Sequence, residues 1–131
     1  MVEIPQSHRD IIEGPNIAHV ATLMPDGSPH STPVWIDIDG NDLVFNTAEG
    51  RQKVRNLDRD GRVAISIHDS ANPYRYIQVR GRVVEKTHEG ADAHIDKMAK
   101  KYLGEDTYPW RGPNEKRVIY RIRPEHITTM G

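Results

Sequence analysis

The sequence predicts a mainly β fold, a small six-stranded β-barrel with helices packed on its outside, in one domain over residues 1–131. Short apolar runs with period-two alternation recur along the chain, and residues that favour turns separate them. Only one long segment, residues 88–103, has the i, i+3, i+4 apolar spacing of a packed helix. A length of 131 residues suits one domain with a modest core.

Six strands are expected, each bounded by turn-forming residues. Residues 25–28 (Pro-Asp-Gly-Ser) form the first turn, and Asp39-Gly40 forms a tight hairpin. Gly81 indicates a bulge or a close backbone approach. Pro124 is expected to end the last strand because proline has no N–H for the ladder. The strands cover residues 16–24, 29–38, 42–47, 62–69, 74–86 and 117–123.

Alternation within each strand predicts which residues share a face. The opposite faces carry Trp35, Asn46, Ser66 and His68, a mixture that a purely solvated face does not require. One explanation is that another subunit covers them. The apolar sets expected to share a face are Ile17, Ala21 and Leu23; Val34, Ile36 and Ile38; and Val63, Ile65 and Ile67.

Three helices are expected. Residues 6–13 form a short one, which Gly14-Pro15 ends. A second covers about residues 51–59. Residues 88–103 form the longest, with Gly104 as a natural C-terminal stop.

Composition excludes several classes of function. A net charge of -1 argues against bulk electrostatic binding to nucleic acid. The absence of cysteine excludes disulfides and thiolate chemistry. The N-terminus lacks the apolar segment of a signal peptide and no run could span a bilayer, so we expect a cytoplasmic protein without a membrane partner.

The strand–turn–helix segment 45–57 is the strongest functional signal. Arg51, Lys53 and Arg55 lie at a helix start beside Gly50, where free backbone N–H groups and cations together suit a phosphate or another anion. By spacing alone, a solvated basic face paired with acidic neighbours is the commoner arrangement. The position at the helix start favours the anion site.

Two other segments are candidates for a binding site. Pro33 predicts an edge strand or a bulge, which leaves the Thr32 hydroxyl and nearby backbone groups free for a ligand. Packing and ligand stacking are equally good interpretations of Trp35. Trp110, in the polar loop 105–115, either anchors that loop or covers a pocket.

The seven histidines show no metal-binding spacing, so no metal site is expected. They are interpreted as surface residues, His94 among them, except that His68 ends a strand near the predicted site. The alternation of Tyr74, Arg75 and Tyr76 resembles single-stranded nucleic-acid binders, but it is also that of an ordinary amphipathic strand.

Eight segments carry a family likeness through their order and spacing: residues 16–23, 26–29, 31–35, 45–47, 51–57, 62–66, 79–83 and 122–124. Together they resemble the split β-barrel flavoproteins similar to pyridoxamine 5′-phosphate oxidase. Within that family the sequence is most similar to the flavin/deazaflavin oxidoreductases that use coenzyme F420, a 5-deazaflavin. The likeness covers nearly the whole chain.

The resemblance implies a homodimer with two cofactor sites at the subunit interface. Arg51 and Lys53 would hold the cofactor phosphate, Asn46 and Thr47 would line the ring, and residues 32–35 would give backbone contacts to its polar edge. The implied cofactor-binding residues are Thr32, Pro33, Val34, Trp35, Asn46, Thr47, Arg51, Lys53, Arg55, Ile67, His68 and Trp110.

The implied function is reduction of an organic acceptor, such as an activated alkene, an enone or a quinone, by hydride from reduced F420. Arg55 and Arg59 would meet the additional negative charge of that cofactor, and His68 or solvent would supply a proton. An FMN-dependent oxidase or reductase and a non-catalytic flavin or deazaflavin carrier are alternatives. A nucleic-acid-binding barrel ranks last.

Overall fold

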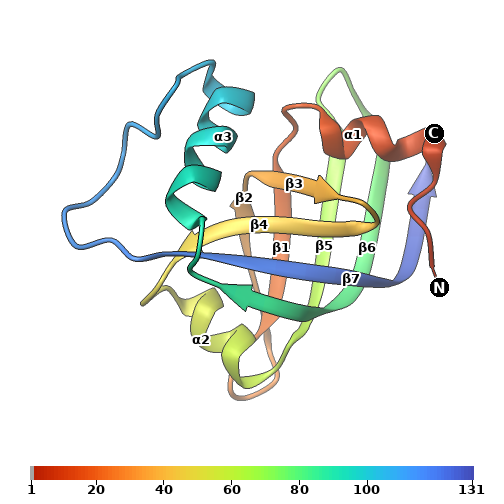
Figure 1. Cartoon of the computed structure of the whole chain (residues 1–131). Coiled ribbons are helices and arrows are strands. Elements are labelled where there is room, and N and C mark those ends of the chain that lie inside the picture. The colour runs from red at the N-terminus through yellow and green to blue at the C-terminus, as the bar shows by residue number, and fades with distance from the viewer. Residues whose placement is uncertain (1) are drawn as a thin grey trace.

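Seven antiparallel strands form one sheet that curls into a split barrel, in the order β2-β1-β5-β6-β7-β4-β3 (Figure 1). The computed structural model describes residues 2–131; residue 1, part of the predicted domain, lies outside them. No helix in that range is long and apolar enough to cross a membrane. The strands are β1 (Ala18–Leu23), β2 (Pro29–Val34), β3 (Ile36–Asp39), β4 (Asp42–Ala48), β5 (Arg62–Asp69), β6 (Asn72–Thr87) and β7 (Arg117–Met130).

The strand predicted over residues 29–38 is two strands, which is why the sheet has seven strands where the sequence predicts six. β2 pairs only with β1, at one edge, and β3 pairs only with β4, at the other. Trp35 lies at the break between them. The chain thus passes directly from one edge to the other, and β2 is the edge strand that Pro33 predicts.

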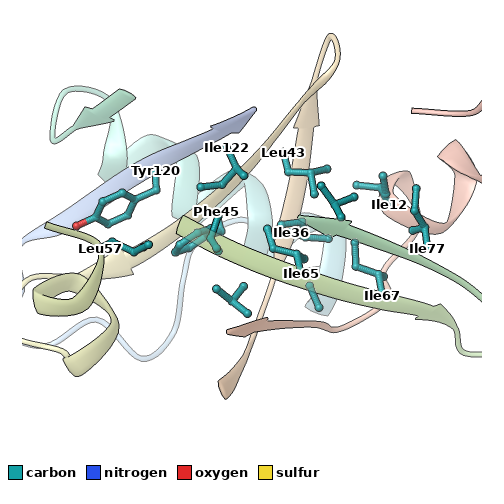
Figure 2. Close-up of a cluster of buried hydrophobic side chains, with 14 of the residues drawn as sticks. Ile12, Ile36, Leu43, Phe45, Leu57, Ile65, Ile67, Ile77, Tyr120 and Ile122 are labelled. Atoms are coloured by element: carbon teal, nitrogen blue, oxygen red, sulfur yellow. The ribbon is translucent and has the colours of Figure 1, made fainter. Parts of the chain in front are cut away.

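Alternate residues of the strands fill the barrel with branched aliphatic side chains (Figure 2). The alternation predicted for β5 is confirmed, since Val63, Ile65 and Ile67 are buried. In β1 the buried face carries Ala18, Val20 and Thr22. The set predicted there, with Ile17 40% exposed, lies on the opposite, outer face.

The long strands β6 and β7 bend together and pass from one half of the barrel to the other (Figure 1). The close approach predicted at Gly81 is confirmed, with a register shift beside it. The expected end of β7 at Pro124 is wrong. Pro124 lies opposite Gly81 and His126 lies opposite Arg80, so Glu125 is an extra residue at a bulge. There the ladder is already interrupted, and a residue without an N–H is tolerated.

The helices lie outside the barrel. α3 contacts β4 and β7 and buries Ile95, Met98 and Ala99, whereas Leu103 stays 40% exposed. Gly104 ends α3 with φ 75, and its N–H donates to the carbonyl of Lys100, as the sequence predicts. The helical elements are η1 (Gln6–His8), α1 (Arg9–Glu13), α2 (Gln52–Arg59) and α3 (Ala91–Leu103).

Replacing Gly81 by alanine is expected to destabilise the protein. The new Cβ would lie 2.1 Å from the carbonyl oxygen of Arg123, a backbone atom that cannot move aside. We expect a loss of at least ~2 kcal/mol in the free energy of unfolding, measured in urea. Gly61→Ala is the control, since its Cβ would meet nothing nearer than 3.6 Å. Equal stability of the two variants would contradict the close approach.

Candidate anion-binding site

A cavity of about 280 Å³ lies at the split of the barrel. Its walls come from the ends of β2 and β4, the start of α2, the start of β7 and the loop between α3 and β7. Figure 1 shows the end of β4 and the start of β7 side by side near α3. The lining residues are Ile17, Pro33, Val34, Trp35, Asn46, Thr47, Arg51, Lys53, Ile95, Tyr108, Trp110 and Arg117.

Lys53 is a buried cation without a partner. Its side chain leaves the first turn of α2 for the cavity wall, and the residue is only 6% exposed. Among residues 2–131 its ammonium group makes neither a hydrogen bond nor an ion pair. Burial, together with the positive charges of Arg51 and Arg117, holds the pKa of Lys53 below its ordinary value. A buried positive charge without a partner costs free energy, and a bound anion would offset that cost.

The backbone around Lys53 adds donors to the same place. Gly50 has φ 91, a conformation that suits glycine, and it leads the chain from β4 into α2. The N-cap residue, Arg51, makes no side-chain cap, so the first N–H groups of α2 lack acceptors. The hydroxyl of Thr47 is buried with no hydrogen-bond partner. Cations, amides and a hydroxyl therefore converge on one end of the cavity.

Arg117 is a third cation of the cavity, and sequence reasoning missed it. It begins β7, is 5% exposed, and its guanidinium carbon lies 5.2 Å from the centre of the Tyr108 ring. It also pairs with Glu115, whose carboxylate lies 3.9 Å from Arg51. Burial alone would raise the pKa of Glu115, but the N–H of Gly112 and the charge of Arg117 hold that pKa below its ordinary value. Only tertiary pairing of β7 with β4 brings Arg117 here.

Aromatic rings also line the cavity, and one of them, Tyr108, lies against Arg117. Trp35 stacks on Tyr102, with ring centres 5.3 Å apart and planes 7° from parallel. Tyr108 meets Trp35 edge-on at 5.9 Å, and Trp110 lies tilted at 6.2 Å. Trp35 thus packs within the chain and lines the cavity as well. Trp110 is 63% exposed at the rim. Flat apolar walls of this kind suit a planar ring.

Four of the predicted site residues do not line the cavity of the single chain. The Thr32 hydroxyl is buried without a partner. Arg55 is exposed, and its guanidinium donates to the carbonyl of Gly50 and to Gln52. Ile67 belongs to the barrel core, and His68 is exposed on the outer face of β5. Their part in binding stays a prediction.

The remaining predicted residues are brought together at the cavity, as its lining shows. The interpretation of the histidines as surface residues is wrong for His8 and His94. His8 is 6% exposed and the His94 side chain is 12% exposed, and each is hydrogen-bonded on both ring nitrogens. The i, i+4 spacing of Ala91, Ile95 and Ala99 predicts the buried face of α3. His94 directly precedes Ile95 and is not part of that set, so its hydrogen-bond partners can be assigned only from the packed structure.

The fold and the site define a split β-barrel with a cationic, aromatic-walled cavity at its open edge. The chain belongs to the pyridoxamine 5′-phosphate oxidase family, since the model of that family matches residues 4–131. No curated protein sequence matches the chain.

Solved structures agree with this assignment. A protein named F420 reductase is 34% identical, with a TM-score of 0.84 over 95% of this chain and 98% of that one. A putative pyridoxamine 5′-phosphate oxidase from Listeria innocua shares the fold at 19% identity, with a TM-score of 0.70 over 92% and 93% of the two chains. A conserved hypothetical protein from Mycobacterium tuberculosis shares it at 22% identity, with a TM-score of 0.73 over 98% and 86%.

Replacing Lys53 by methionine separates anion binding from folding. Methionine has a similar length and carries no charge to desolvate, so the free energy of unfolding is expected to hold or to rise by up to ~1 kcal/mol. Affinity for inorganic pyrophosphate, followed by thermal shift, is expected to fall about tenfold or more.

Lys116→Met is the matched control. Lys116 is exposed in the loop directly before β7, and its replacement removes the same positive charge. If both variants lose affinity equally, the effect is one of net charge and Lys53 holds no anion. A large loss of stability in Lys53→Met would instead assign it a structural role.

Proposed function

We propose that the protein is a reductase that binds F420 through its phosphate and passes reducing equivalents to an organic acceptor such as an enone or a quinone. The observation that carries the proposal is the buried, unpartnered Lys53 beside Arg51 and Arg117, in a cavity that aromatic rings also line. The 34% identity to a protein named F420 reductase supports the choice of cofactor.

The residues of the cavity fit such a cofactor. The Lys53 ammonium, the hydroxyl of Thr47 and the first N–H groups of α2 would hold the phosphate. Trp35 and Tyr108 would orient a planar ring and exclude water from it. When bound, a reduced deazaflavin supplies hydride chemistry of its own. The side chains then serve to bind and orient, and none has to act as a nucleophile.

A homodimer with the cofactor at its interface is part of the proposal. A volume of about 280 Å³ is just below the ~300–1,000 Å³ of typical ligand sites. Ile17 lines the rim while lying on the outer sheet face, next to β5 with Ser66 and His68. A second subunit on that face would enlarge the cavity and cover these residues.

FMN is the second candidate cofactor, because one observation weakens the sequence-based argument for F420. Arg55 and Arg59, the cations expected to meet the additional charge of F420, bond to groups of the chain itself and do not line the cavity. Arg117 is the additional cation in their place. A carrier that binds either cofactor without turnover remains the third candidate.

Parallel titration with F420 and FMN tests the proposal. Because the 34% identical protein is named F420 reductase, we expect F420 to bind with a low micromolar Kd, followed by fluorescence quenching, and FMN to bind more weakly. Reduced F420 should be oxidised by at least one member of a panel of enones and quinones. Light scattering should give the mass of a dimer.

Each part of the proposal can fail separately. Protein that is yellow as purified, with tight FMN binding, would replace F420 by FMN. Binding without oxidation across the panel would leave a carrier. A monomeric mass in the presence of bound cofactor would refute the shared site.

A further inference from the structure

A line of four hydrogen-bonded side chains leads from α3 to the wall of the cavity. Nε2 of His94 lies 3.1 Å from a carboxylate oxygen of Asp37, and Nδ1 of His94 lies 3.1 Å from Nδ2 of Asn46. Oδ1 of Asn46 accepts from Nε of Arg117 at 2.8 Å. Asn46 and Arg117 line the cavity, whereas Asp37 and His94 stand behind them. The functional residues therefore have a second layer of polar support.

The amide of Asn46 has only one workable orientation. Its Nδ2 donates to the carbonyl of Ala91 at 2.8 Å as well as to His94, and its oxygen faces the N–H of Arg117. Exchanging oxygen and nitrogen would set oxygen against the Ala91 carbonyl and N–H against N–H at Arg117. Asn46 thus uses both amide N–H groups within the chain, and only a second lone pair of its oxygen remains for a ligand.

That orientation also assigns the proton of His94. Because Nδ1 accepts from Asn46, the imidazole is neutral and carries its proton on Nε2, which donates to Asp37. Burial alone would raise the pKa of Asp37, but hydrogen bonds from His94 and Lys97 outweigh it and hold that pKa below its ordinary value. The ionised carboxylate fixes the imidazole, and the imidazole fixes the amide.

Arg117 is held on three sides, and one of its nitrogens, Nη2, is left without a partner. Its Nε bonds to Asn46, its Nη1 bonds to Glu115, and the guanidinium lies over the Tyr108 ring. Its Nη2 makes no hydrogen bond with any part of the chain in residues 2–131. A guanidinium whose rotation is blocked loses little entropy when it binds an anion.

We propose that His94 is a positioning residue, which acts through Asn46 to aim the free amino group of Arg117 at a phosphate or carboxylate in the cavity. The proposal rests on the proposed function for the identity of the ligand. The proposal gives α3 a role in the binding site as well as in packing, because His94 lies between the buried residues Ala91 and Ile95 of this helix. It also makes Arg117 the determinant of anion affinity that Asn46 and His94 tune.

A double-mutant cycle tests the proposal with F420 and FMN as probes. His94→Leu removes both hydrogen bonds and is expected to raise the Kd about tenfold. His94→Asn places an amide oxygen where Nδ1 accepts and should recover most of the affinity. In an Arg117→Met background, His94→Leu should cause no further loss, because the residue through which it acts is gone. A purely structural role would give the same loss in both backgrounds and overturn the proposal.

A second readout does not depend on any cofactor. In a ¹⁵N NMR spectrum the Nε–H signal of Arg117 should be sharp in the wild type and in His94→Asn, and should broaden in His94→Leu as the guanidinium becomes free to rotate. An unchanged signal in His94→Leu would overturn the inference. Wild-type protein that binds neither cofactor but shows the expected NMR change would refute the proposed function alone. If His94→Leu does not fold, Asp37→Asn, which weakens the hold on Nε2, takes its place in both measurements.

Discussion

Strand structure is interrupted at Trp35, between β2 and β3, and the rest of the structure depends on this interruption. It sends β2 and β3 to opposite edges of one sheet, and those edges do not pair. The last turn of α3 supplies the missing bonds: the Tyr102 hydroxyl accepts from the N–H of Ile36, and the Lys101 ammonium donates to the Ile36 carbonyl at 2.7 Å. Burial there raises the pKa of Tyr102 to about 12 and lowers that of Lys101 to about 8. Side chains of α3 thus satisfy backbone groups at the open edge of β3, where no strand pairs with it.

The cavity follows from that opening. A fully paired barrel would fill its interior with side chains, as this one does around Phe45 and Tyr120. At the split, β4 ends and α2 begins, so Lys53 leaves a helix start instead of a strand and lies buried at the cavity wall with no partner among residues 2–131. The structure carries that unfavourable charge because the hydrophobic core, away from the split, supplies the stability.

Local signals in the sequence predicted most helices and strands. The end of β7 and the roles of Arg117 and His94 depend on long-range pairing, which the sequence does not show. The alternation of β5 and the glycine at 104 act within a few residues, and the predictions about them are confirmed. The prediction for Gly81 is confirmed too, although the backbone that approaches it is that of Arg123 in β7. Pro124 misled because a bulge in β7 itself, at Glu125 opposite Arg80 and Gly81, removed the need for its N–H. Arg117 and His94 gave no signal, because their roles depend on β7 and α3 meeting β4, more than 45 residues away in sequence for each.

Within the proposed function, the anion end of the cavity does not select between the two cofactors. Lys53, Arg51 and Arg117 bring three positive charges and Glu115 one negative, a net charge of two, which can accommodate either a phosphate monoester or a diester. Selection therefore falls to the ring end. Flavin N5 accepts a hydrogen bond and the C5 of a deazaflavin does not, so a backbone donor facing that atom favours flavin. Pro33 leaves one position of the edge strand β2 at the cavity wall without such a donor, so flavin gains no hydrogen bond from the backbone of residue 33.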